Sequence, residues 1–167
     1  MPVKTEAYIA LGSNLGDREL NLLRAVSELG RLSGCRVTAL SRFYETSPVG
    51  MADGTPGFLN GVLRLETELG AHELLRELQR IEQQVFGRTS SPAAVSRRMD
   101  LDLLLYGQQS LAEPELTLPH PRMAQRRFVL QPLAEIAPEL VDPSSGRTIK
   151  ELLATLVSDE RVTPLEG

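Results

Sequence analysis

Two aspartates stand two positions apart in the middle of the chain, where residues 97–106 read RRMDLDLLLY. Successive side chains of a strand point to opposite faces, so Asp100 and Asp102 would share one face, with their bases about 7 Å apart. Two like charges on an otherwise apolar strand repel, which favours a cation between them. Mg²⁺ takes one or two carboxylates and completes its shell with water and substrate phosphates, so the pair indicates phosphoryl-transfer chemistry. The alternative is a solvent-facing strand edge whose acids pair with Arg97 and Arg98.

Basic side chains flank these acids along the sequence. Phosphoryl transfer needs cations directed at the charge that develops on the transferred and leaving groups, and arginine supplies them without exchanging a proton. His120 lies between two prolines, which restrain its backbone. Scattered surface arginines and a structural histidine are the alternative, since these groups act together only if the fold gathers them. The arginines are Arg88, Arg97, Arg98, Arg122, Arg126 and Arg127.

A third set of residues indicates a pocket for a flat ligand. The amide of Asn60 offers two donors and an acceptor to the edge of a heterocycle. Phe58 and Phe128 offer aromatic faces on which such a ring can stack. The segment 46–50, which reads TSPVG, precedes them in the chain. Each aromatic taken singly also fits a position in the core.

Composition limits the classes of function. The chain has 167 residues, which suits one domain with a single core, and 41% of them are apolar and 24% charged, as in globular proteins. The net charge of −4 argues against binding to nucleic acid or to anionic membranes. A lone cysteine, Cys35, excludes an internal disulfide and favours a reducing cytoplasm. The sequence offers neither a cationic leader nor the roughly 18 apolar residues of a membrane span.

The elements that must position these residues follow from the hydrophobic periodicity. Strands are predicted over 5–11, 35–46 and 58–67 and at the paired aspartates. An apolar stripe through Leu15, Leu22, Leu23, Val26 and Leu29 predicts a first helix, and a second stripe from Leu74 to Val85 predicts another that ends at Gly87. The sequence Gly12-Ser13-Asn14 lacks the pattern of a known phosphate loop, which favours a structural turn with a helix cap.

The order strand, helix, strand, strand, helix, strand predicts an α+β fold, a ferredoxin-like βαββαβ sandwich with helices on one face of an antiparallel sheet. After Gly107 the chain continues as a C-terminal extension of the same domain, which then spans residues 1–167. In this extension 116–121 is predicted to be extended, and 123–136 largely helical, with Pro132 restricting where that helix begins. A last helix is expected over about 148–157.

Taken in chain order, these segments resemble the 6-hydroxymethyl-7,8-dihydropterin pyrophosphokinases of folate biosynthesis. The likeness is carried by 8–16 (YIALGSNLG), 44–50 (YETSPVG), 58–60 (FLN), 79–82 (QRIE), 97–106, 118–120 (LPH) and 127–140 (RFVLQPLAEIAPEL). The resemblance implies transfer of the terminal diphosphate of ATP to the hydroxymethyl group of the reduced pterin, with release of AMP. We expect a cytoplasmic enzyme that is a monomer.

The resemblance assigns roles to individual residues. Asp100 and Asp102 would hold two Mg²⁺ ions, and Arg88 and Arg97 would join them in catalysis. The ATP side would comprise Gln79, Glu82, Arg97, Thr117, His120 and Arg126. The pterin side would comprise Thr46, Ser47, Val49, Phe58, Asn60 and Phe128, with the ring between the two phenylalanines.

The chain departs from the family pattern between Arg88 and Arg97. Members usually carry further basic residues and a tryptophan there, whereas this chain reads TSSPAAVS over 89–96. A paralogue that binds pterin or ATP with little transfer is therefore one alternative function. A ferredoxin-like RNA-binding module is another, but its adjacent sheet aromatics on a basic face are not evident in this acidic sequence.

Overall fold

The computed structural model describes residues 3–46, 57–87 and 99–165. The helices are α1 (Arg18–Gly30), α2 (Ala71–Arg80), α3 (Arg127–Ile136) and α4 (Ile149–Thr155), with a π-helical turn over Ile81–Val85 and a 3₁₀ turn over Met123–Gln125. The strands are β1 (Thr5–Ser13), β2 (Cys35–Leu40), β3 (Tyr44–Thr46), β4 (Phe58–Thr67), β5 (Asp100–Tyr106), β6 (Leu111–Ala112), β7 (Thr117–Leu118) and β8 (Val162–Pro164).

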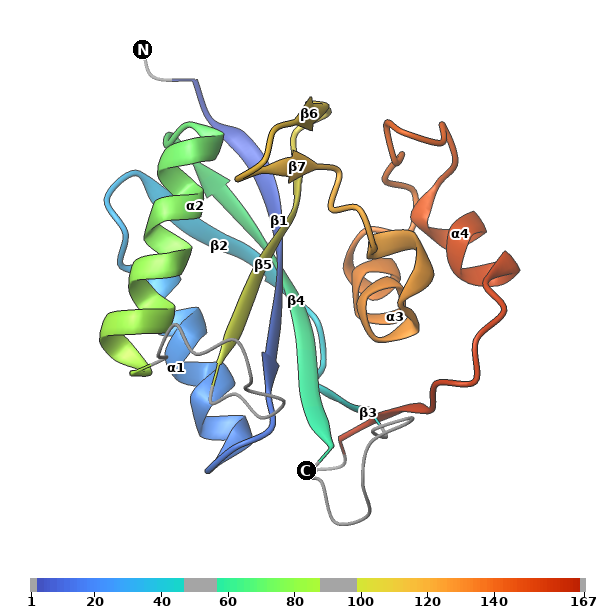
Figure 1. Cartoon of the computed structure of the whole chain (residues 1–167), viewed down its shortest axis with the longest axis horizontal. Helices are drawn as coiled ribbons and strands as arrows, with labels where there is room; N and C mark the ends of the chain where they lie inside the picture. Colours follow the sequence, from blue (N-terminus) through green and yellow to red (C-terminus); the bar gives the residue numbers. More distant parts are fainter. Residues whose placement is uncertain (1–2, 47–56, 88–98, 166–167) are drawn as a thin grey trace.

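One antiparallel sheet organises the molecule. Its strand order is β5-β1-β4-β3-β8, and β2 also pairs with β4. Helices α1 and α2 lie on one side of this sheet, while α3 and α4 lie on the other (Figure 1). The predicted combination of an antiparallel sheet with helices is confirmed, and the two helices of the C-terminal extension cover the second face.

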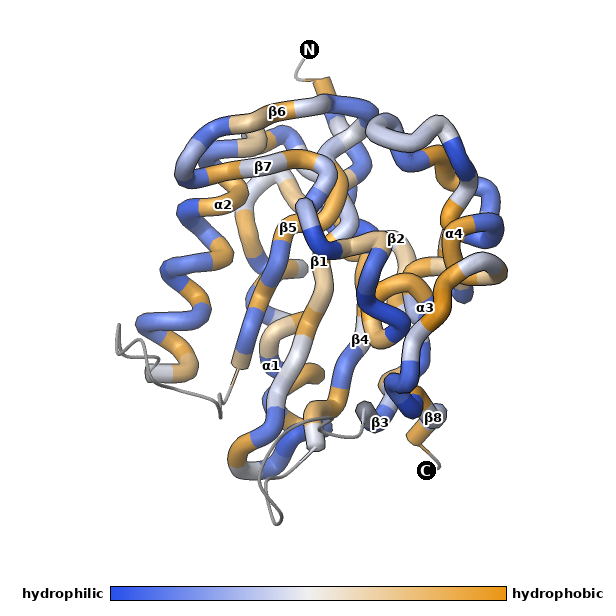
Figure 2. Tube along the Cα trace, turned by 45° about the vertical axis from the view of Figure 1, so that its right-hand side comes forward, coloured by the Kyte–Doolittle hydropathy of each residue, from blue (hydrophilic) through white to orange (hydrophobic). Residues whose placement is uncertain are grey.

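Apolar side chains fill the space on both faces of the sheet. Ile9, Leu11 and Leu63 pack with residues of α1 and α2 in one cluster. Tyr8 and Val62 pack with α3 and α4 in the other, because neighbouring strand residues alternate between faces. Hydrophilic and hydrophobic residues alternate along α2, as expected of a helix with one buried side (Figure 2). Burial of both faces holds the sheet rigidly beneath the candidate site.

Several predicted elements are confirmed. Strand β4 covers 58–67 as predicted, the strand predicted at the paired aspartates is β5 over 100–106, and α4 covers most of 148–157, with Thr148 as its cap. The exit at Gly87 is also confirmed, and its positive φ of 65° suits a residue without a side chain. The π-helical turn before it was not predicted.

The strand predicted over 35–46 is interrupted. β2 ends at Leu40 and β3 begins at Tyr44. At the break, the backbone N–H of Ser41 donates to the Val62 carbonyl at 2.9 Å, while the Ser41 hydroxyl accepts from the Val62 N–H at 3.0 Å. A side-chain oxygen thus replaces a backbone carbonyl as acceptor, which lets the backbone leave the ladder.

The turn predicted at Gly12-Ser13-Asn14 is wrong. β1 continues through Ser13, because Gly12 pairs with Asn60 on one side and with Asp100 on the other. The cap of α1 is Asp17, whose carboxylate accepts from the Leu20 N–H at 3.1 Å.

Two details of the predicted helices also differ from the structure. Leu15 and Leu23, which were assigned to the apolar stripe of the first helix, are 42% and 48% exposed. Pro132 was expected to restrict the start of its helix, yet α3 begins five residues earlier and contains it. The short strands β6 and β8 were not predicted. No helix among the described residues is long and apolar enough to cross a membrane.

Candidate active site

Two cavities meet at the paired aspartates. The first, of about 280 Å³, lies between β1, β4, β5 and the start of α3. The second, of about 460 Å³, lies between α2, β5 and residues 120–126. Asp100, Asp102 and Arg126 line both cavities. Ligands in the two cavities would therefore meet at two carboxylates and one guanidinium.

The β5 strand places the two carboxylates as the alternation predicts. Leu101 and Leu103 are buried in the core under α1 and α2, while Asp100 and Asp102 are half-buried and face the cavities. The residues opposite the acids on β1 are small, since Asp100 pairs with Gly12 and Asp102 with Ala10. Small side chains at these positions leave open space beside the carboxylates.

Glu82 fixes the backbone of β5 between the two acids. It lies in the π-helical turn, is 7% exposed, and its Oε2 accepts from the Leu101 N–H at 2.7 Å. A buried carboxylate that accepts a backbone N–H holds the strand firmly, because a charged acceptor makes the hydrogen bond strong. Glu82 also lines the second cavity.

Polar and aromatic side chains combine in the first cavity. Asn60 is buried and its Nδ2 donates to the Thr46 Oγ1 at 2.7 Å. Phe58 on β4 and Phe128 on α3 line the same space. The fold thus brings together four residues that the sequence singled out for a flat ligand.

Arg126 connects the two cavities. It immediately precedes α3, and its guanidinium carbon lies 5.5 Å from the centroid of the Phe128 ring. At this distance the cation and the ring attract each other, so each orients the other.

His120 faces the second cavity as a neutral donor. Its Nδ1 accepts from the Arg122 N–H at 3.2 Å, which leaves the proton of the neutral ring on Nε2. Burial lowers the pKa of His120 below 6.5, and the positive charge of Arg126 lowers it further, while Asp100 acts in the opposite direction. The imidazole is thus uncharged near neutral pH.

The lowered pKa of His120 predicts a pH-dependent stability. Without ligands, as pH falls below 6.5, the unfolded chain gains a proton on this residue before the folded chain does. The free energy of unfolding should therefore fall between pH 6.5 and the lower pKa of the folded state. Urea unfolding at pH 7.5 and 5.5, with a chelator present, measures this loss, which His120→Gln should reduce. An equal loss in both proteins would contradict the prediction.

The remaining ATP-side residues lie around the second cavity. Gln79 lines it from the last turn of α2. Thr117 does not, but it lines an adjoining cavity of about 220 Å³ together with His120 and Asp102. Five of the residues singled out lie outside the described residues, as does the unusual segment 89–96: they are Ser47, Val49, Arg88, Arg97 and Arg98.

Sequence reasoning missed Arg18. From the first turn of α1 its guanidinium donates to the Gly57 carbonyl at 3.0 Å and pairs with the Glu45 carboxylate. Gly57 directly precedes Phe58, and Glu45 directly precedes Thr46. Arg18 therefore links β3 to the start of β4 beside the first cavity. Ala10, Gly12 and Val129, which line that cavity, were also missed. The small size of residues 10 and 12 indicates open space beside the strand, but the sequence does not show which residues they oppose.

Comparison with known proteins identifies the family. The sequence model of 7,8-dihydro-6-hydroxymethylpterin-pyrophosphokinase (HPPK) matches residues 8–138. The chain belongs to this family. The HPPK match contains every described residue that lines the two cavities.

Individual relatives agree with the HPPK assignment. The chain is 46% identical over 146 residues to the 2-amino-4-hydroxy-6-hydroxymethyldihydropteridine pyrophosphokinase of Bacillus subtilis, covering 87% of this chain and 86% of the relative. It is 43% identical over 147 residues to the protein of the same name from Synechocystis, covering 88% of this chain and 74% of the relative.

Solved structures share the fold. An HPPK-DHPS structure from Plasmodium falciparum aligns with a TM-score of 0.72 and 15% identity, covering 91% of this chain. The present chain spans 43% of the length of that Plasmodium chain. At this identity the likeness concerns the arrangement of helices and strands alone.

Proposed function

We propose that this enzyme transfers the terminal diphosphate of ATP to the hydroxymethyl group of 6-hydroxymethyl-7,8-dihydropterin and releases AMP, a step of folate biosynthesis. The observation that carries the proposal is the meeting of two cavities at Asp100, Asp102 and Arg126. One cavity has an aromatic and amide lining suited to a heterocycle, and the other, of about 460 Å³, presents Arg122, Arg126 and His120 together with the paired acids. Close relatives bear the name of this pyrophosphokinase.

The first cavity would bind the pterin. The Asn60 side chain, held by Thr46, would pair with the polar edge of the ring, while Phe58 and Phe128 would stack on its faces. Ser47 and Val49, assigned by resemblance, would complete this site. The hydroxymethyl group would then point towards the shared acids, since they form the boundary with the second cavity.

The second cavity would bind the triphosphate. Arg126 and the neutral His120 would donate to phosphate oxygens, and Gln79 and Thr117 would contact the nucleotide. Arg88 and Arg97 belong to this group by resemblance. In the reaction, the pterin hydroxyl oxygen bonds to the β-phosphorus and loses its proton. The bond from that phosphorus to the oxygen retained by AMP breaks.

Two Mg²⁺ ions would be held by Asp100 and Asp102. The residues fit such ions, because two half-buried carboxylates face one space and oxygen is the ligand that Mg²⁺ prefers. When bound, the ions would neutralise charge on the phosphates and align them for in-line displacement. Glu82 would keep the two carboxylates in register by fixing the backbone between them.

We also infer that β1, α1, β2, β4, α2 and β5 form a ferredoxin-like βαββαβ sandwich. We further infer that the chain is one domain. The strand order β5-β1-β4-β2 and its antiparallel pairing support this topology. The packing of α3 and α4 on the same sheet supports a single domain. A monomeric state and a cytoplasmic location stay predictions.

The direct test is product formation. The purified protein is incubated with ATP, Mg²⁺ and 6-hydroxymethyl-7,8-dihydropterin, and AMP is quantified by chromatography. AMP should form only when all three are present, in amounts equal to the pterin diphosphate. Binding of both substrates without AMP would refute the transferase and support the non-transferring paralogue.

Gly12→Ala should weaken pterin binding. A Cβ at this position would lie 3.0 Å from the Asn60 Oδ1 and 3.6 Å from the Phe58 Cδ1, so it would displace the groups that face the ring. Overpacking of this kind costs about 1–3 kcal/mol, so we expect the KM for pterin to rise about tenfold or more. The KM for ATP should change little.

Gly30→Ala provides the matched control, since its Cβ would meet Val37 at an ordinary 3.8 Å, far from both cavities. Steady-state kinetics with each substrate varied in turn separate the two variants. Equal KM values for pterin in both would contradict the role given to Gly12.

A further inference from the structure

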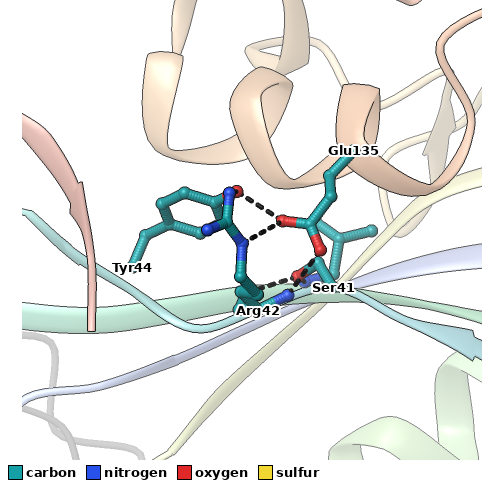
Figure 3. Close-up of polar contacts among 5 residues, drawn as sticks. Ser41, Arg42, Tyr44 and Glu135 are labelled. Atoms are coloured by element: carbon teal, nitrogen blue, oxygen red, sulfur yellow. Dashed lines mark hydrogen bonds and ion pairs between the residues drawn. The ribbon is translucent and has the colours of Figure 1, made fainter. Parts of the chain in front are cut away.

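A polar network ties α3 to the segment that leads into β3 (Figure 3). Glu135, in the last turn of α3, accepts a hydrogen bond from the Tyr44 hydroxyl through Oε1. Its Oε2 accepts from the Arg42 backbone N–H at 2.8 Å, and the Arg42 Nε lies 3.4 Å from Oε1. Both carboxylate oxygens are thus bonded to residues more than 90 positions earlier in the chain.

Tyr44 lies in the protein interior and is 2% exposed. Burial raises the pKa of the Tyr44 phenol, and the neighbouring carboxylate of Glu135 raises it further, so the hydroxyl keeps its proton and donates. A charged acceptor makes this a strong hydrogen bond, and its loss would leave Glu135 without one of its donors.

The two ends of the network belong to opposite walls of the first cavity. On one side Tyr44 pairs with Asn60 in the β3–β4 ladder, and Thr46 follows two residues later. On the other side α3 presents Phe128, two turns before Glu135. The described residues that line the cavity include neither Tyr44 nor Glu135. The network therefore lies behind the walls and connects them.

α3 lacks one of its internal hydrogen bonds because of its sequence. Pro132 has no N–H to donate to the carbonyl of Phe128, four residues before it. Buried side chains such as Val129 and Leu133 pack the helix against the sheet, and the bonds of Glu135 fix its last turn to the β3 segment.

We propose that Tyr44 and Glu135 are positioning residues that set the separation between the Asn60 wall and the Phe128 wall, and thereby the affinity for pterin. The inference rests on the proposed function, because it takes the first cavity to be the pterin site. A flat ring is sensitive to this separation, since its stacking energy falls steeply once the faces move apart.

Tyr44→Phe tests the proposal, because it removes one oxygen atom and keeps the ring. We expect the KM for pterin to rise about tenfold, with the KM for ATP and kcat at saturating pterin within twofold of the parent protein. Glu135→Gln is the second variant. Its amide has one acceptor oxygen in place of two, so the KM for pterin should rise in the same direction.

Tyr106→Phe is the matched control. Tyr106 is 7% exposed and its hydroxyl donates to the Leu69 carbonyl at 2.6 Å, within the cluster under α1 and α2. The same atom is removed, so a general loss of stability would affect this variant as well. Its KM for pterin should match that of the parent protein.

The outcomes separate the two proposals. A rise in the KM for pterin confined to Tyr44→Phe and Glu135→Gln supports the positioning role. Equal effects of Tyr44→Phe and Tyr106→Phe, or equal increases in both KM values, would overturn it while leaving the proposed function intact. If the parent protein converts no pterin, the proposed function fails and the positioning role falls with it.

Discussion

Asp102→Asn is expected to reduce turnover at least about 1,000-fold while the protein stays folded. The substitution keeps the size of the side chain and removes its charge, so a metal-binding role is lost without a change in packing. Removal of a group that stabilises developing charge costs about two to three orders of magnitude for a neutral donor alone, and a metal ligand contributes more. The same loss is expected for Asp100→Asn.

The stability of these variants should change little, in contrast to their activity. Both side chains are half-buried at the cavities and lie outside the apolar core, and the substitution keeps their size. Thermal unfolding in the presence of a chelator should therefore give a midpoint close to that of the parent protein. The assay for AMP measures the activity.

Asp159→Asn serves as the control for the charge change, since Asp159 is exposed and lines neither cavity. It should keep full activity. Turnover within tenfold of the parent protein in Asp100→Asn or Asp102→Asn would remove the acids from the catalytic machinery.

Arg126→Met should lower kcat about 100-fold and also raise the KM for pterin. This arginine lines both cavities and stacks over Phe128, so it serves the phosphates and the ring at once. Loss of one donor directed at developing charge costs about 10²–10³ in rate. Loss of the cation over the ring removes a smaller contribution, on the order of 1 kcal/mol.

Arg122→Met separates these effects, because Arg122 lines the second cavity and not the first. It should raise the KM for ATP and leave the KM for pterin unchanged. Arg126→Lys adds a second comparison, as lysine keeps the charge and loses the planar surface that stacks. If Arg126→Met and Arg122→Met change kcat, the KM for ATP and the KM for pterin alike, the prediction that Arg126 contacts both substrates is wrong.

The sequence predicted strands best where hydrophobic alternation alone decides them. β4 and β5 are flanked by strong turn or polar segments, and the strand over 58–67 was predicted at its bounds, while the strand at the paired aspartates was predicted by its position in the chain. The break at Ser41 depends on a side-chain hydroxyl that accepts from Val62, a residue 21 positions later. Local propensity carries no information on such a long-range bond.

The sequence predicted which residue types form the candidate site, but not how those residues are arranged in space. The spacing of Asp100 and Asp102 placed both on one face, as found. Which residues oppose them depends on the β1–β5 register, and a bulge between Tyr8 and Ile9 shifts that register. The small residues Ala10 and Gly12 face the acids as a result, and no periodicity in the sequence reveals it.

The bond between Glu82 and Leu101 also bears on how the sheet meets other chains. β5 and β8 are the outermost strands in the sheet order, and outermost strands can recruit a further strand through their unpaired backbone groups. The Glu82 carboxylate takes the Leu101 N–H, and Pro164 has no N–H to offer in β8. The carboxylate that steadies the strand of the two aspartates therefore also occupies a backbone donor that an added strand would use.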